Sequence, residues 1–222
     1  MLFLVPIFSF LLSSSSLAFQ CPNVTTMDNL NLTEYVKEKW YIQRQQITPY
    51  LPLNSNYCVT ARYSISNKTV PFYNGKVINV YNNARFNSVN GSNLNSNNNT
   101  LCARINGKNS KLLVAPCFLP NIFAGDYWIL LAGPSGDNYQ YAIVSGGQPN
   151  KKYKSGCSTS IKTINDSGLW ILTRNQTVSD DLIEDMITFL VKNGITTSLL
   201  NKVEQKNVYI KTIDDIITMK EN

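Results

Sequence analysis

The stretch Cys58–Ser66 (CVTARYSIS) alternates between apolar and polar side chains along its length. Its apolar positions are Val59, Ala61, Tyr63 and Ile65, and its polar positions are Thr60, Arg62 and Ser64. Successive side chains of a β-strand point to opposite faces, so this alternation puts one face on a core and the other in solvent. The stretch therefore predicts a strand of an antiparallel sheet that is buried on one side.

Seven further β-rich runs flank this stretch: Lys39–Ile47, Lys76–Phe86, Asn99–Asn106, Lys111–Cys117, Asp126–Gly133, Tyr139–Gly146 and Gly168–Arg174. Turn sequences separate the runs, among them Asn74-Gly75, Asn106-Gly107 and the segment Gly133–Asn138. Eight short runs with short connections are typical of an up-and-down sheet, and closure into a barrel would remove its exposed edges. We therefore expect an all-β fold, an eight-stranded antiparallel barrel.

Two segments depart from the strand pattern. The first, Ser88–Thr100, has six Asn among thirteen residues and predicts a flexible surface insertion. The second begins at Ser179, a good helix N-cap, continues with acidic residues and with apolar residues three and four positions apart, and ends before Gly194. This pattern predicts one amphipathic C-terminal helix over about 179–193, packed on the outside of the barrel.

The N-terminal segment indicates export. Leu2–Leu12 is an apolar run of 11 residues, too short for a membrane-spanning helix, which needs about 20. The small residues Ser16 and Ala18 follow it, as they do before a signal-peptide cleavage site. We expect a signal peptide over 1–18, a domain over 19–212 and a polar tail over 213–222, in a secreted protein without a stable membrane anchor.

Composition narrows the classes of function. The chain has 222 residues, of which 15% are charged, and no histidine, which excludes a Ser-His-Asp triad, a Cys-His dyad and a His-ligated metal. We expect no cofactor and no metal. The net charge of +6 comes from scattered Lys and Arg, which favours a solvated surface over a nucleic-acid site. Seven residues begin the triplet that accepts N-glycans: Asn23, Asn31, Asn67, Asn90, Asn98, Asn165 and Asn175.

Three segments resemble, in order along the chain, the three sequence signatures of the lipocalin family: Asn31–Tyr41 (NLTEYVKEKWY), Gly125–Tyr127 (GDY) and Leu169–Arg174 (LWILTR). Glu38 and Gly125 stand where the family usually has Gly and Thr. Cys21–Asn23 and Asn56–Ser64 are similar to the branch that contains apolipoprotein D and the bacterial lipocalins.

The resemblance implies an eight-stranded barrel with a helix alongside. Its structural signature residues here are Trp40, Asp126, Tyr127 and Arg174. By the family pattern Arg174 should lie across Trp40 and plug the closed end of the barrel, where a guanidinium over an indole contributes about 0.5–2 kcal/mol.

The resemblance also implies that the barrel holds a small hydrophobic ligand such as a fatty acid, sterol, retinoid or pigment. The family pattern puts Tyr63, Asn82 and Trp128 in this pocket, and Trp170 joins them because it shares strand parity with Arg174. Aromatic walls with a few polar groups suit such ligands. The alternative is that these side chains fill the interior and leave no cavity.

The five cysteines suggest two disulfides. Cys102 and Cys117 lie symmetrically about a turn centred between Asn109 and Ser110, so they would face each other directly in a hairpin. Cys157 lies 13 residues before Trp170, where the apolipoprotein D branch has a cysteine bridged to its N-terminal one, and this implies Cys21–Cys157. Other pairings stay open. This scheme leaves Cys58 as a free thiol.

Cys58 raises an enzymatic alternative, a thiol-dependent lipid isomerase like the lipocalin-type prostaglandin D synthase. However, Cys58 shares strand parity with Thr60 and Arg62 on the expected outer face, which argues against a nucleophile in the pocket. We therefore expect a secreted, glycosylated carrier of a hydrophobic ligand and no enzyme. A further alternative is a filled barrel that binds a receptor through its loops, and Cys58 also offers a route to a covalent homodimer.

Overall fold

The computed structural model describes residues 19–95 and 100–206. The predicted signal peptide (1–18), four residues of the Asn-rich insertion (96–99) and the predicted tail (213–222) lie outside the described residues. No helix in the described part is long and apolar enough to cross a bilayer.

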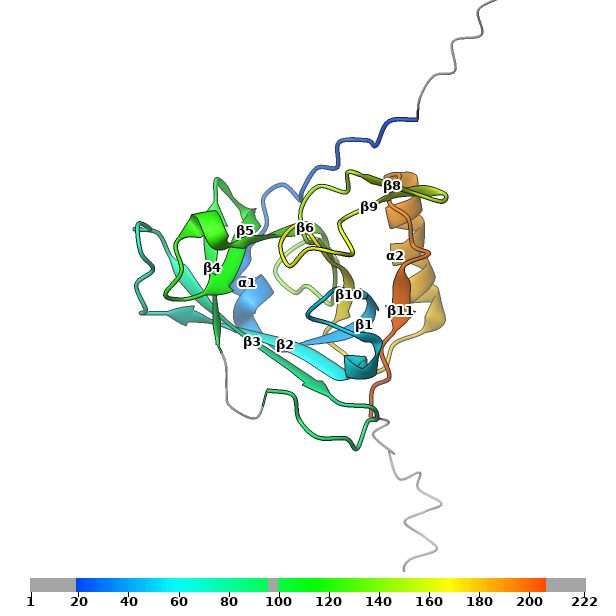
Figure 1. Cartoon of the computed structure of the whole chain (residues 1–222), viewed down its shortest axis with the longest axis horizontal. Helices are drawn as coiled ribbons and strands as arrows, with labels where there is room; N and C mark the ends of the chain where they lie inside the picture. The colour runs from blue at the N-terminus through cyan, green and yellow to red at the C-terminus, as the bar shows by residue number, and fades with distance from the viewer. Residues whose placement is uncertain (1–18, 96–99, 207–222) are drawn as a thin grey trace, which may run out of the picture.

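Eight strands of the described chain close into an antiparallel barrel, because the first pairs with both the second and the last (Figure 1). They are β1 (Trp40–Gln46), β2 (Tyr57–Ser66), β3 (Val77–Arg85), β4 (Leu101–Asn106), β5 (Lys108–Pro116), β6 (Gly125–Gly133), β7 (Tyr141–Ser145) and β10 (Leu169–Thr173). Each pairs with its neighbour in chain order, apart from the loop excursion between β7 and β10. The barrel expected from the alternating runs is confirmed.

Three strands were not expected. β8 (Lys151–Tyr153) and β9 (Gly156–Ser158) form a separate hairpin in the loop before β10. β11 (Leu200–Lys202) adds to β1 beyond the point where β2 leaves it. The residues after β11 also bond to this edge: Val203 N donates to Gln43 O of β1 at 3.0 Å, and Glu204 N donates to Asn56 O, just before β2, at 2.9 Å. The wall between β1 and β2 is therefore completed by the C-terminal segment.

A short helix, α1 (Leu32–Lys37), closes one end of the barrel. Asn31 begins it as the N-cap, and its Oδ1 accepts a hydrogen bond from Glu34 N at 3.3 Å. Such a cap satisfies a backbone N–H that has no partner in the first helical turn. Leu32, Tyr35 and Val36, spaced three and four positions apart, are buried in the interior cluster.

The C-terminal helix α2 (Asp180–Lys192) lies outside the barrel, beside β11 (Figure 1). Ser179 Oγ accepts from Leu182 N at 3.4 Å, which is the N-cap expected from the sequence. Ile183, Met186 and Leu190 are buried against the outer faces of β6, β7 and β10, and full burial of one such side chain contributes about 1.5–3 kcal/mol. Gly194 ends the helix region with a φ of +69°, which favours glycine.

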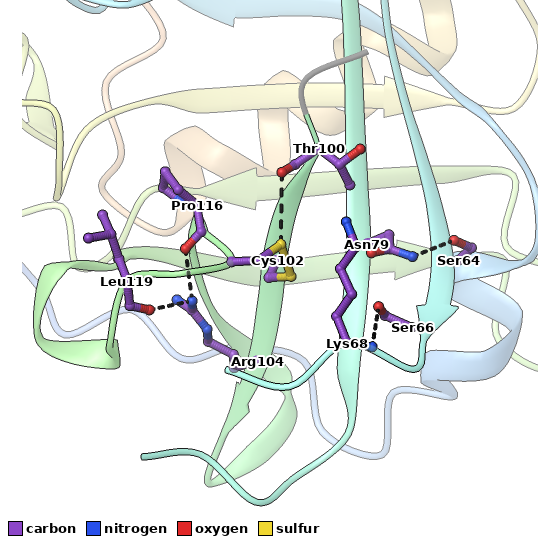
Figure 2. Close-up of a disulfide and its surroundings, with 10 residues drawn as sticks. Ser64, Ser66, Lys68, Asn79, Thr100, Cys102, Arg104, Pro116 and Leu119 are labelled. Carbon is purple, nitrogen blue, oxygen red and sulfur yellow. Dashed lines mark hydrogen bonds between the residues drawn. A yellow bond between two sulfur atoms is a disulfide. The ribbon is translucent and has the colours of Figure 1, made fainter. Parts of the chain in front are cut away.

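Both expected disulfides are present. Cys21–Cys157 ties the N-terminal arm to the β8–β9 hairpin with a Cα–Cα distance of 5.8 Å. Cys102–Cys117 joins β4 to the end of β5, with Cα atoms 4.9 Å apart (Figure 2). Their expected direct opposition is wrong, because Cys102 pairs with Ala115. The hairpin turns at Gly107 (φ +79°), one of the predicted turn residues, so the disulfide is diagonal and joins residues on the same face.

Candidate ligand-binding site

One end of the barrel interior is closed by Trp40 and Arg174. Trp40 is fully buried, and its Nε1 donates to Tyr35 O at 2.9 Å. The guanidinium carbon of Arg174 lies 3.6 Å from the centre of the Trp40 ring. Its nitrogens donate to the backbone carbonyls of Glu34, Tyr35, Glu38 and Tyr139. Arg174 therefore stabilises the closed end, as the family pattern implied, and its polar atoms serve the backbone.

Three tyrosine hydroxyls meet in the interior above this plug. The hydroxyl of Tyr127 lies 2.8 Å from that of Tyr35 and 2.7 Å from that of Tyr63. Each phenol carries one O–H proton, so two hydrogen bonds use two of the three protons. One O–H of this tyrosine trio therefore has no partner within the trio.

Burial keeps the tyrosine trio neutral. Loss of solvent contact raises the pKa of Tyr35 and Tyr127 well above the ordinary value and raises the pKa of Tyr63 to about 12. The hydroxyls thus remain hydrogen-bond donors at physiological pH. A buried neutral donor suits a ligand oxygen better than a free cation would, because it costs less to desolvate.

Trp170 extends the trio along β10. Its ring stacks on Tyr127 with a centroid distance of 6.4 Å and an interplanar angle of 23°. Trp170 belongs to the interior cluster together with Leu172, while Leu169 and Ile171 belong to the outer one. The parity argument that put Trp170 on the same side as Arg174 thus agrees with its placement.

The aliphatic wall around these aromatics is formed by the inward-facing residues of the barrel strands. Its buried members include Ile42, Val59, Ala61, Ile78, Val80, Ala103, Leu112, Ile129 and Val144. Other interior-facing residues keep exposed surface, namely Leu101, Val114, Tyr127 and Trp170. The side chains at the plug are thus fully buried, whereas these four interior-facing residues are only partly buried.

Of the residues expected in the pocket, Trp128 lies on the outer side of the barrel and Asn82 is exposed. Trp128 faces outward, where it packs with the cluster beneath α2 and the Lys111 ammonium lies 4.2 Å from its ring centre. Its neighbour Tyr127 points inward, because adjacent strand residues face opposite sides and the Tyr127 hydroxyl bonds to the trio. Asn82 has the parity of the interior residues Val80 and Ala84 but is exposed, and its backbone carbonyl accepts from Asn95 Nδ2 at 2.5 Å.

Gln45 is an interior residue that sequence reasoning missed. It is fully buried on β1 and pairs across the sheet with Trp170. Its Nε2 donates to Asn56 Oδ1 at 2.5 Å, whereas its Oε1 has no hydrogen-bond partner. A buried acceptor of this kind is costly unless something donates to it. The run IQRQQ does not indicate which Gln points into the barrel, because a pairing irregularity between Ile42 and Arg44 shifts the alternation of the residues that follow.

The remaining signature and surface residues lie at the rim or outside. Burial raises the pKa of Asp126, which lies half-buried at the start of β6. Cys58 is the free cysteine; it has a φ of +50°, and its Sγ lies 3.7 Å from the carbonyl oxygen of Val89 in the insertion. Cys58 is not part of the interior cluster.

No group of three potential metal ligands occurs within residues 19–95 and 100–206.

The predicted glycosylation sites differ in exposure. Asn23, Asn67, Asn90 and Asn175 are exposed, and Asn98 lies outside the described residues. Asn31 and Asn165 are half-buried, and their side-chain amides donate hydrogen bonds within the protein. Asn31 Nδ2 donates to Asp137 at 2.8 Å, and Asn165 Nδ2 donates to Phe123 O at 3.3 Å.

Comparison with known proteins gives one sequence relative. No family model matches the chain. Temperature-induced lipocalin-1 of Arabidopsis thaliana is 31% identical over 93 residues, which are 41% of this chain and 39% of that protein. The match thus covers well under half of the relative's length.

Solved structures with a similar fold cover most of the chain. The major allergen Per a 4 from cockroaches aligns with a TM-score of 0.53 and 18% identity, over 84% of this chain and 96% of that one. Lobster apocrustacyanin A1 aligns with a TM-score of 0.53 and 17% identity, over 85% of this chain and 92% of that one. At these identities the likeness concerns the fold.

Proposed function

The sequence match and the fold support placing this chain among the lipocalins, and from that premise we propose that it binds and carries one small hydrophobic molecule inside its barrel. The observation that carries the proposal is the stacked pair of Tyr127 and Trp170. Both rings belong to the apolar interior yet are only partly buried, so they leave aromatic surface in the interior for a ligand to contact.

The polar groups of the interior suggest how the ligand is oriented. The tyrosine trio has one O–H without a partner in the trio, and Gln45 Oε1 is a buried acceptor. A ligand with a carbonyl, carboxyl or hydroxyl group at one end would accept from the trio, while its apolar body would contact the aliphatic wall. A fatty acid, a sterol, a retinoid or a pigment has this form.

Other features support the proposed compartment. Two disulfides are typical of proteins from an oxidising environment. Together with the apolar N-terminal run and the exposed sequons, they support a secreted glycoprotein. The position of Cys58 outside the interior supports a carrier without thiol catalysis.

The test is ligand extraction followed by titration. Purified protein is extracted with organic solvent and the extract analysed by mass spectrometry; the delipidated protein is then titrated with a fatty acid, a sterol and a retinoid. We expect quenching of tryptophan fluorescence that is lost in Trp170→Phe and retained in Trp128→Phe, the matched control on the outer face. An empty extract together with no response to any of the three ligands would refute the proposal.

A second candidate function is binding of a protein through the loops. Four large apolar side chains in two loops are strongly exposed, with exposed fractions of 76% for Phe118, 83% for Ile122, 59% for Phe123 and 72% for Ile164. The two loops are in contact, because Asn165 Nδ2 donates to Phe123 O. Apolar surface of this kind marks interaction sites. Sedimentation of wild-type protein and of Ile122→Ser tests it, since self-association or receptor capture that depends on Ile122 favours this function.

A further inference from the structure

The charges of the chain are segregated along its length. From Lys39 to Gly125 there are nine Lys and Arg residues and no Asp or Glu. This stretch builds β1 to β5, so one side of the barrel is basic. Four of the acidic residues are instead on α2: Asp180, Asp181, Glu184 and Asp185. The charged residues are therefore less evenly scattered than expected.

A cavity of about 220 Å³ lies on the outer face of this basic side. Arg62 and Ser64 of β2, Asn79 and Tyr81 of β3, and Lys68 of the following loop contribute to its lining. Figure 2 shows the Lys68 side chain running beside Asn79 toward Thr100. Tyr63 and Thr100 complete the lining. The cavity lies on the outer face, because Arg62 and Ser64 have the outward parity of β2 and Asn79 and Tyr81 that of β3, although Tyr63, whose side chain belongs to the interior cluster, also borders it. Its volume is below the roughly 300–1,000 Å³ of a drug-sized pocket, so it suits one small chemical unit.

The two cations of this cavity have no carboxylate nearby. Its lining contains no acidic residue, and neither Arg62 nor Lys68 forms an ion pair with any residue of the described chain. The loop that carries Lys68 is held by a hydrogen bond from Lys68 N to Ser66 Oγ at 3.0 Å (Figure 2). Two positive side chains around one hollow form a site for an anion.

The same cavity has an acceptor that an anion cannot satisfy. Asn79 Nδ2 donates to Ser64 Oγ at 3.3 Å, while the buried Asn79 Oδ1 has no hydrogen-bond partner. A bare sulfate or phosphate ion would meet the two cations but could not donate to Asn79 Oδ1, whereas a ligand that also carries a hydroxyl could do so. Saccharides that carry a sulfate or carboxylate have both kinds of group on one small ring.

We propose that this outer cavity binds one anionic saccharide unit. Its sulfate or carboxylate interacts with Arg62 and Lys68, and a ring hydroxyl donates to Asn79 Oδ1. The site would let the protein attach to acidic glycans while the barrel interior stays available for its hydrophobic ligand.

The test is calorimetric titration of the full-length protein with three probes: a sulfated heparin-derived disaccharide, a neutral disaccharide and inorganic sulfate. We expect the sulfated disaccharide to bind most tightly. Arg62→Gln and Lys68→Gln should each weaken it about ten-fold, as expected for loss of a charge-assisted hydrogen bond. Asn79→Leu should weaken the disaccharide and leave the affinity for inorganic sulfate unchanged.

The control variant is Lys76→Gln, which removes an exposed cation of the same acid-free stretch that does not line the cavity. We expect it to change the affinity by less than about two-fold, because exposed charges are screened by salt. Equal losses in Lys76→Gln and Arg62→Gln would overturn the proposal in favour of diffuse attraction. Absence of binding, or sulfate binding as tightly as the disaccharide, would also overturn it. Titration with the hydrophobic ligand panel is independent of all these outcomes.

Discussion

The Arg174 guanidinium lies over the fully buried indole of Trp40, with its carbon 3.6 Å from the ring centre, and joins the end of the last barrel strand to the first. The same group donates to carbonyls of α1, of the residue after it and of the segment before β7. One side chain therefore holds together three parts of the closed end.

Removal of this side chain should destabilise the barrel. We expect Arg174→Ala to lower the free energy of unfolding by about 2–4 kcal/mol, because the ring contact is lost and several buried carbonyls lose their donor. Arg174→Lys should recover part of this, since an ammonium reaches fewer acceptors. Urea unfolding measures both. A loss below about 0.5 kcal/mol in Arg174→Ala would contradict the role assigned to the plug.

Within the tyrosine trio the central hydroxyl should matter most. Tyr127→Phe leaves two hydroxyls without their common partner, whereas Tyr63→Phe, the matched control, removes an end member. We expect the first to cost about 2–3 kcal/mol and the second about 1 kcal/mol. Chemical denaturation of the two variants tests this order, and equal costs would show that the trio does not act as a connected network.

Alkaline pH should destabilise the protein through Tyr63. Burial raises its folded-state pKa to about 12, above the value of about 10 in an unfolded chain. The folded state therefore binds more protons between these two values, and the free energy of unfolding falls as the pH rises from about 10 to about 12. Urea midpoints measured across this range should decline less steeply in Tyr63→Phe. A slope that is unchanged in the variant would refute the assignment.

The Cys58 thiol should be independent of ligand binding. Its sulfur lies against the insertion, outside the interior cluster. We expect Cys58→Ser to keep the affinity for a hydrophobic ligand within about two-fold, since no contact with the ligand is lost. Thiol labelling should proceed at the same rate with and without ligand. Labelling that the ligand blocks would instead support the isomerase alternative.

The barrel was predictable from sequence because period-two alternation reports directly which faces of a strand are wet. Alternation does not show which of the two faces of a strand points toward the barrel axis when both faces carry large apolar side chains. Tyr127 and Trp128 illustrate this: both are large aromatics on one strand, and only the hydroxyl partners of Tyr127 on α1 and β2 decide which one is inside. Those partners come from distant parts of the chain.

Register was the other part that sequence symmetry could not give. Placing the β4–β5 turn midway between two cysteines assumes a regular hairpin, but Gly107 turns the chain earlier and an irregularity beside Asn106 absorbs the difference. Cys102 and Cys117 still bond, because a shift of two residues preserves the face. The site on Arg62, Lys68 and Asn79 depends on cross-strand neighbours in the same way, and no local motif marks it.

The C-terminal segment that completes the wall between β1 and β2 has a consequence for the order in which the protein is made. Gln205 Nε2 donates to the carbonyls of Ile42 on β1 and Val59 on β2. Those two strands are synthesised more than a hundred residues earlier. A nascent chain must therefore hold the first two strands with part of their edge unsatisfied until the ribosome releases the residues that follow α2. α2 and β11 are thus added after all eight barrel strands have been made, and the wall between β1 and β2 is completed only once the residues that follow α2 have been synthesised.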